Sequence, residues 1–422
     1  MRIPLFLVAA AVMFFGCDSG DDSNPPSSIS ISGRVTEDAS YGKTADVEGA
    51  VVSAASVESD GQLSHHPDTT VVQANGRYTL EIEEADDVNQ YVLVEAVGDT
   101  FSTSVILLRE PSDDSAVAAP MNGESDAEAD VFVASRSDAA ELTLPRISAF
   151  VDAAVAAELQ DGSASASEVA MLILEGQEAE EEYVEQREPD SKSPREPVDD
   201  KRDTDEAAYL DLQTALDAST TATAEQEAIA DFEDVFVTGY VNGGVSTSLN
   251  AEAAEVGRSA MVEFAADASV SADVAAAARN RADLFVGLAL SAAVRAQLVA
   301  ADAGATALAA VDAAASAMLS AIANATSSTQ VDAAFDAYGV TVDAQLAATI
   351  GVSEAVLLSA RVATDAARAT LDAAIDVAAD AEAIAVAHKA YFAAAEAAAE
   401  AALATSADAE IGAEVVALTS LR

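Results

Sequence analysis

The side chain best suited to chemistry in this sequence is its single cysteine, Cys17. It lies just beyond an almost uninterrupted apolar run from Ile3 to Phe15, which itself follows the positively charged Arg2. Such a run is too short to cross a bilayer as a permanent helix, and it fits the hydrophobic region of a signal peptide. One cysteine also excludes an internal disulfide. We therefore expect an exported protein whose thiol acts as a nucleophile during processing.

The residues around this cysteine form a recognisable motif. Phe14-Phe15-Gly16-Cys17 resembles a bacterial lipobox, in which a small residue precedes the cysteine that receives diacylglycerol. Gly16 and Cys17 match, whereas Phe14 replaces the usual leucine and Phe15 replaces a small residue. The resemblance implies that residues 1–16 are cleaved and that the lipid on Cys17 holds the chain in the cell envelope. The expected location is the outer membrane or cell surface, with the periplasmic side as an alternative.

The three histidines give little sign of a metal site. His65 and His66 are adjacent, and neighbouring side chains of an extended backbone point to opposite faces, so we interpret them as an exposed loop pair. His388 follows Ile384 by one helical turn and is expected to be partly buried rather than a ligand. No metal and no cofactor are predicted.

The sequence holds neither a complete calcium loop nor a recognised catalytic motif. The stretch Ser56-x-Glu58-x-Asp60-Gly61 is weakly similar to a calcium loop, but Pro67 stands where an EF-hand needs its bidentate acid. The sequence contains no G-x-S-x-G, H-E-x-x-H, C-x-x-C, P-loop or Rossmann fingerprint, so no enzyme and no catalytic residue are predicted. A hydrolase using two of the 73 acidic residues stays open as a distant alternative.

The charge of the chain is extreme. Its 422 residues carry 20 Lys and Arg against 73 Asp and Glu, for a net charge of −53. This balance excludes nucleic acid as a partner and excludes binding to anionic lipid through a basic patch, while weak association with calcium or magnesium is expected. Only four basic residues are lysines, and an acidic, lysine-poor composition resembles that of proteins from extreme halophiles. Concentrated salt would screen the self-repulsion that such a charge produces.

The first elements predicted after residue 28 are short strands. Alternating apolar residues and turn signals predict strands near 29–35, 47–55, 69–72, 77–82, 91–97 and 101–108. A turn is expected at Asn75-Gly76, and a long loop between Ser56 and Asp68. Short strands at this spacing, with no helical period between them, indicate a small antiparallel β-sandwich.

The order of these strands resembles the carboxypeptidase regulatory-like domain, a transthyretin-like β-sandwich. The first matching stretch is Ile31-Ser32-Gly33-Arg34-Val35, and the most specific one is Asn75-Gly76-Arg77-Tyr78-Thr79-Leu80. Val47 to Val52 and Tyr91 to Val94 match between and after them. The resemblance implies a non-catalytic spacer or docking unit.

Beyond residue 125 the composition becomes rich in Ala, Glu, Asp and Leu, which favours helices. Helices are predicted near 146–159, 167–188 (capped by Ser167), 205–218, 223–238, 249–266, 272–302, 305–325, 329–337, 341–349 and 353–405. One buried stripe is visible, formed by Leu308, Val311, Ala315, Met318 and Ile322. In the last helix, Val377, Ile384 and Tyr391 recur every seven residues. A helical bundle in water is expected, since acidic residues recur too often for a membrane bundle.

The predicted fold class is therefore α+β and multidomain, a small β-sandwich followed by a larger all-α bundle. The segments are a signal peptide (1–16), the lipidated cysteine and flexible tether (17–28), the β-sandwich (29–110), a linker (111–124), a helical segment (125–188), a charged proline-containing linker (189–204) and an alanine-rich helical domain (205–422).

The leading functional hypothesis is a non-catalytic envelope lipoprotein with a structural, adhesive or protein-interaction role toward an unidentified envelope or surface partner. A featureless helical surface would favour this hypothesis. The alternative is a ligand-binding accessory lipoprotein of a transport system, which a groove lined by Tyr and Phe would favour. The hydrolase would need a deep pocket with two acids of raised pKa.

Overall fold

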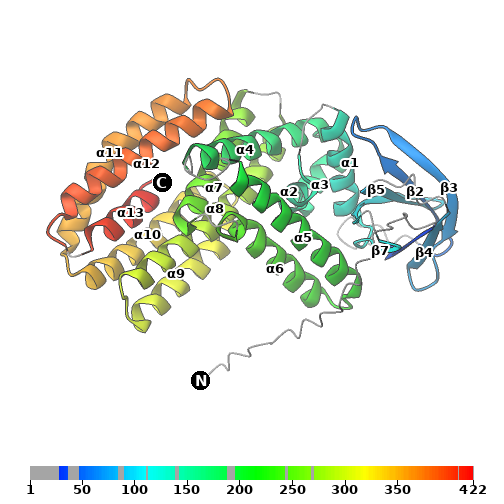
Figure 1. The fold of residues 1–422 in the computed structure, drawn as a ribbon, viewed down its shortest axis with the longest axis horizontal. Helices are drawn as coiled ribbons and strands as arrows, with labels where there is room; N and C mark the ends of the chain where they lie inside the picture. The colour runs from blue at the N-terminus through cyan, green and yellow to red at the C-terminus, as the bar shows by residue number, and fades with distance from the viewer. Residues whose placement is uncertain are drawn as a thin grey trace, which may run out of the picture.

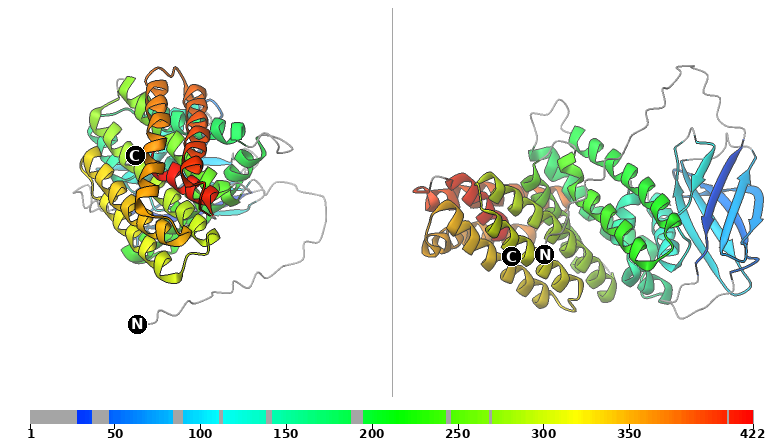
Figure 2. Two further views of the ribbon diagram at one scale, coloured as in Figure 1. Left: turned by 90° about the vertical axis from the view of Figure 1, so that its left-hand side faces the viewer. Right: turned by 90° about the horizontal axis from the view of Figure 1, so that it is seen from below.

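We obtained the structure as a computed structural model, which describes residues 28–36, 47–83, 90–110, 113–137, 142–187, 195–242, 246–267, 270–406 and 408–421. Within these ranges, strands occupy the N-terminal part and helices all that follows. Figures 1 and 2 show the strands gathered at one end of an elongated molecule and helices α10–α13 at the other. The predicted fold class is confirmed. The predicted signal peptide, the lipobox and Cys17 lie outside the described residues.

The β region consists of two sheets. A three-stranded sheet has the order β4-β1-β7, and a four-stranded sheet has the order β3-β2-β5-β6. Every pairing is antiparallel except that of β1 with β7, which is parallel. The strands are β1 (Ile29–Arg34), β2 (Val51–Val57), β3 (Leu63–Val71), β4 (Arg77–Ile82), β5 (Tyr91–Val97), β6 (Ser102–Leu108) and β7 (Ser115–Val117). β7 lies in the stretch that we expected to be a linker.

Alternation along the strands builds the sandwich core. In β4, Tyr78, Leu80 and Ile82 are buried, while the residues between them are exposed. Gly76 has φ +78°, so the predicted Asn-Gly turn forms where glycine is favoured. Gly33 is paired with Tyr78 across the sheet, and a Cβ at position 33 would collide with the Tyr78 ring. Gly33 and Tyr78 belong to separate stretches of the sequence, and the large ring at position 78 requires a residue without a Cβ at position 33.

The expected loop between Ser56 and Asp68 is wrong. β2 and β3 form a hairpin whose turn spans Glu58 to Gln62, and β3 already begins at Leu63. β3 is an edge strand with no fully buried side chain. It therefore carries no apolar alternation from which sequence analysis could find its first half.

The helical part begins at residue 123. Its helices are α1 (Gly123–Ser137), α2 (Leu144–Phe150), α3 (Ala153–Asp161), α4 (Ala166–Arg187), α5 (Glu196–Ala218), α6 (Ala222–Asn242), α7 (Thr247–Asp267), α8 (Ala272–Ala300), α9 (Ala305–Ala323), α10 (Ser328–Ile350), α11 (Glu354–Ile375), α12 (Ala381–Leu403) and α13 (Ala409–Thr419). Neighbours in the chain pack as pairs, including α5 with α6, α7 with α8, α9 with α10 and α11 with α12. Figure 1 shows these pairs side by side.

Several predicted helix boundaries differ from those observed because capping residues divide the chain. The helix expected at 146–159 is two helices, and Asp152 caps the second by accepting from the backbone N–H groups of Ala154 and Val155. The cap of α4 is Ser165, which exchanges hydrogen bonds with Glu168, rather than Ser167. The chain is already helical from Glu196, inside the stretch 189–204 that we expected to be a linker.

The C-terminal helices are also divided differently. The expected long helix at 353–405 is a hairpin of α11 and α12, and the Asp380 carboxylate caps α12 by accepting from the N–H of Ala383. Val377 therefore lies in the turn, 79 % exposed, whereas Ile384 and Tyr391 are buried. Conversely, the helices expected at 329–337 and 341–349 are one continuous helix, α10. α13 was not predicted.

The predicted stripe of α9 is confirmed, since Val311, Met318 and Ile322 are buried and Leu308 and Ala315 pack against them. By length and composition alone, α8 and α9 are apolar enough to cross a membrane. More than half of the apolar window of α8 is buried inside the protein, as in a core helix.

The sandwich and the helices share one core. Val57, Ile106 and Leu108 belong to the same apolar cluster as the helices, and α1 packs on β6. Polar contacts reinforce the junction. Arg77 Nη1 donates to both carboxylate oxygens of Asp217, at 3.1 Å to Oδ1 and 2.9 Å to Oδ2. Arg34 Nη2 donates to the carbonyl of Leu216 at 2.9 Å. These contacts set the distance between the two parts and leave a cleft beside them.

Candidate ligand-binding cleft

A cleft of about 630 Å³ opens where the sandwich meets the helices. Thr36 and the segment after β7, which includes Pro120, form its sandwich side. Helices α1, α2, α5 and α6 and the first residue of α3 form the remainder, with Arg281 reaching in from α8. The cleft therefore depends on the docking of the two parts and exists in neither part alone.

Aromatic and aliphatic side chains line the cleft. Tyr209 of α5 and Phe232 of α6 meet edge to face, with ring centroids 6.1 Å apart. Tyr209 is only 2 % exposed, and its hydroxyl forms no hydrogen bond with any other described residue. Burial, followed by the nearby Glu128 carboxylate, raises the pKa of Tyr209 well above its usual value. This hydroxyl is thus a neutral, unoccupied hydrogen-bonding group in the cleft wall.

Glu128 of α1 is the buried carboxyl group of the cleft. It is 9 % exposed, and its Oε1 accepts a hydrogen bond of 2.9 Å from the Ser148 hydroxyl. No lysine or arginine pairs with it among the residues described. Burial, reinforced by Glu124 on the same helix, raises the pKa of Glu128 to about 8 against the lowering effect of Ser148. The group is therefore mostly protonated at neutral pH.

Two of the three other glutamates that line the cleft, Glu225 and Glu233, are held by arginines. Glu225 Oε1 lies 2.7 Å from Arg34 Nη2, and Glu233 Oε1 lies 2.5 Å from Arg281 Nη2. Arg281 also donates through Nε to the carbonyl of Ala149 at 2.8 Å. These contacts hold both side chains in place and leave Glu128 as the buried acid without a cationic partner.

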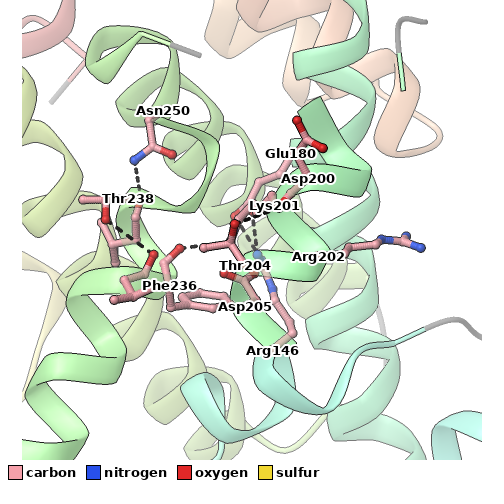
Figure 3. Close-up of polar contacts among 12 residues, drawn as sticks. Arg146, Glu180, Asp200, Lys201, Arg202, Thr204, Asp205, Phe236, Thr238 and Asn250 are labelled. Atoms are coloured by element: carbon pink, nitrogen blue, oxygen red, sulfur yellow. Dashed lines mark hydrogen bonds and ion pairs between the residues drawn. The ribbon is translucent and has the colours of Figure 1, made fainter. Parts of the chain in front are cut away.

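A second polar cluster lies in the helical core. Arg146 of α2 forms two hydrogen bonds with Glu180 of α4, at 2.5 and 3.0 Å. Lys201 of α5 contacts Asp205 Oδ2 at 2.5 Å and donates to the carbonyl of Phe236 at 2.9 Å. Figure 3 shows these groups converging from separate helices.

This core cluster has the character of a structural network. Burial raises the pKa of Asp205 to about 6, although Lys201 and its hydrogen bond act in the opposite direction. The Lys201 ammonium also lies 4.2 Å from the centroid of the Phe236 ring. The two voids beside the cluster hold only about 20 Å³ each, which is room for a water molecule and not for a substrate.

The residues singled out from the sequence are not brought together by the fold. His65 and His66 lie on strand β3 rather than in a loop, and a ring nitrogen of His66 is 3.0 Å from Ser56 Oγ. Glu58 and Gly61 belong to the hairpin turn. Among the described residues there is no group of three or more His, Cys, Asp or Glu side chains placed to hold a metal ion.

His388 is more deeply buried than expected. It is 1 % exposed on α12, and neither ring nitrogen has a hydrogen-bond partner among the described residues. Its ring lies 6.3 Å from that of Phe392. Burial lowers the pKa of His388 to about 4, so it is a neutral core side chain.

Glu128, Ser148 and Tyr209 were not predicted from the sequence. Glu128 is one of 73 acidic residues, and no spacing distinguishes it from the others. Tyr209 could have drawn attention as one of only eight tyrosines, but nothing in the sequence places it beside a residue 81 positions earlier. Comparisons of the chain with protein-family models, with curated proteins and with solved structures find no match.

Proposed function

We propose that this chain is a non-catalytic, lipid-anchored envelope protein that binds a small ligand in the cleft between its sandwich and its helices. The observation that carries the proposal is the cleft itself, with Tyr209 and Phe232 in its wall and the unpaired Glu128 beside them. Small-molecule sites are typically concave, mostly apolar, placed at domain junctions and supplied with a few polar groups. A groove lined by Tyr and Phe was the feature expected of a ligand-binding accessory lipoprotein.

In this proposal the N-terminal segments attach the protein to the membrane. The lipid on Cys17 anchors the chain, and residues 17–28 act as a solvated tether. The sandwich, as a unit of the carboxypeptidase regulatory-like type, serves as spacer and forms one wall of the cleft. Such a protein would hold its ligand close to the membrane for a transport system.

A structural or adhesive role is the second candidate, and one surface favours it. Leu358 and Val362 lie four residues apart on α11 and are 63 % and 60 % exposed. This apolar pair is available to a protein partner. The hydrolase receives less support, because Glu225 and Glu233 each form an ion pair with an arginine and so do not stand as a second free acid beside Glu128.

The anchor can be tested by intact-mass spectrometry of protein extracted from native membranes. We expect cleavage before Cys17 and an added mass that corresponds to a diacylglycerol group and a further acyl chain. The Cys17→Ser variant should be released from the membrane fraction. A mature protein with an unmodified Cys17, or with the leader still attached, would contradict the proposal.

The ligand site can be tested by ligand-observed NMR against a library of small neutral, anionic and cationic compounds. Ala153 is an exposed residue that lines the cleft, so Ala153→Trp should obstruct it, whereas Ala154→Trp alters the adjacent exposed position outside the lining. Compounds that bind the unaltered chain should be lost with Ala153→Trp and retained with Ala154→Trp. Equal binding to both variants would show that the cleft is not the site.

A further inference from the structure

We propose that the cleft is selective for a small organic cation, an ammonium group attached to an apolar body, which is held at Glu128 and Tyr209. The inference rests on the proposed function and specifies the chemical class of the ligand. It follows from three observations: the charge of the lining, the unpartnered tyrosine hydroxyl and the apolar wall.

The lining has more acidic than basic side chains, although Glu225 and Glu233 are paired with arginines and Glu128 is mostly protonated at pH 7. It contains Glu124, Glu128, Glu225 and Glu233, and one basic side chain, Arg281. Arg281 already donates to Glu233 and to the carbonyl of Ala149, so its charge is paired with an acid of the same lining. An anionic ligand would be repelled in a chain whose net charge is −53, whereas a cation would be attracted into the cleft.

Two polar groups in the wall suit an ammonium. The Tyr209 hydroxyl has no partner among the described residues, and Glu128 keeps carboxyl hydrogen-bonding capacity beyond its bond from Ser148. An ammonium N–H can donate to the tyrosine oxygen and to a carboxylate oxygen at the same time. The aromatic rings of Tyr209 and Phe232 also favour a cation in the same cleft.

The remaining wall favours an apolar body on the ligand over an inorganic ion. Leu212, Leu216 and Ile229 line the cleft, and Ile229 is the exposed large apolar side chain among them, at 36 %. Calcium and magnesium prefer six or more oxygen ligands around one point, whereas no group of three or more acidic or histidine side chains among the described residues is placed to hold a metal ion. An alkyl or aralkyl amine matches both the polar and the apolar parts of the lining.

Binding of a cation would change the protonation of Glu128. Glu124 of its own helix, Ser148 of α2 and Tyr209 of α5 are the polar groups that act on Glu128 or are acted on by it, while the α6 glutamates and Arg281 of α8 line the same cleft. In the empty cleft its pKa of about 8 leaves roughly 0.9 proton on it at pH 7. An ammonium in contact favours the carboxylate, so binding should release up to about 0.9 proton at pH 7.

The experiment is isothermal titration calorimetry of the full chain at pH 7 with three probes of one shape. These are 2-phenylethylamine as the cation, 2-phenylethanol as the neutral analogue and 3-phenylpropionate as the anion. The titrations are repeated in phosphate and in Tris, because the difference in buffer ionisation enthalpy reports the number of protons released. We expect the amine to bind at least about tenfold more tightly than the alcohol, with no detectable binding of the anion.

Two conservative variants and one control complete the test. Glu128→Gln preserves the shape of the protonated acid, so it should fold, bind the amine at least about tenfold more weakly and release no proton. Tyr209→Phe removes only the hydroxyl and should weaken amine binding severalfold while proton release persists. Glu227→Gln changes an exposed acid of α6 outside the lining and should behave as the unaltered chain.

Three results would overturn the inference. Equal affinity for amine and alcohol, or amine binding without proton release, would show that charge at Glu128 does not select the ligand. Binding of the alcohol or the anion in place of the amine would also exclude the cation class, while leaving a ligand site in the cleft. Absence of binding by every library compound in the NMR screen would instead remove the proposed function together with the inference.

Discussion

Gln213 of α5 occupies the place that a neighbouring strand would take beside Leu108 of β6. Its side-chain amide donates to the Leu108 carbonyl and accepts from the Leu108 N–H, both at 3.1 Å. Gln213 is buried, and β6 is the edge strand of the four-stranded sheet. One side chain thus satisfies both backbone groups of an edge residue and joins the sandwich to the helices.

We expect Gln213→Leu to lower the free energy of unfolding by about 2–4 kcal/mol. The reason is that two buried backbone groups of Leu108 would lose their partners. Because the chain has no tryptophan, urea unfolding should be followed by far-ultraviolet circular dichroism. Gln226→Leu, at an exposed site on α6, is the matched control and should change the value by less than about 0.5 kcal/mol. Equal effects would contradict the role assigned to Gln213.

The buried ion pair of Arg146 and Glu180 supports a second prediction. Replacing Glu180 by Gln leaves the Arg146 charge buried without its partner, which typically costs about 3–5 kcal/mol. The space around this pair is tight, since a Cβ on Gly257 would meet the Glu180 side chain. The urea midpoint should therefore fall sharply for Glu180→Gln. The exposed Glu178 on the same helix provides the comparison, and Glu178→Gln should leave the midpoint nearly unchanged.

His388 predicts a specific dependence of stability on pH. Its folded pKa of about 4 lies below the ordinary histidine value of 6.5, because burial disfavours the charged ring; Glu255 of α7 opposes this effect and Arg258 reinforces it. The unfolded chain therefore binds a proton that the folded chain excludes. The resulting loss of stability begins as the pH falls through 6.5 and is complete near 4.

Between pH 7.5 and pH 5 this one group should remove about 2 kcal/mol of stability. His388→Leu should abolish that contribution. Buried acids of raised pKa, such as Glu252 at about 7, act in the opposite direction, so the quantity to measure is the difference between the two chains at each pH. Parallel curves for the two chains would show that His388 does not titrate on unfolding.

The charge of −53 leads to a prediction about salt. The melting temperature should rise steadily from dilute buffer to molar potassium chloride, because the salt screens repulsion among the acidic side chains. Calorimetric melting over a salt series would measure it. A melting temperature that is the same in dilute buffer and in brine would contradict the halophilic interpretation.

Local features were predictable from residue order because their causes lie within a few positions. The Asn75-Gly76 turn, the alternation of Tyr78, Leu80 and Ile82, and the stripe of α9 each follow from the backbone period and burial on one face. Predicted helix boundaries were wrong where a capping residue starts a new helix inside a stretch of strong helix propensity, as at Asp152 and Asp380. The strand predicted at 69–72 began too late, because β3 is an edge strand and an edge strand can lack an apolar face.

Residue order alone therefore determined the two structural classes of this chain, its acidity and the candidate lipidation of Cys17, since composition and short-range pattern are sufficient for these. The cleft was decided only by tertiary structure. It requires Glu128, Ser148 and Tyr209, which come from three helices, to meet beside the sandwich. The raised pKa values of Glu128 and Tyr209 depend on what surrounds these groups in space, and so does the Ser148 hydrogen bond to Glu128. Those surroundings are set by the packing of distant segments rather than by neighbours in the chain.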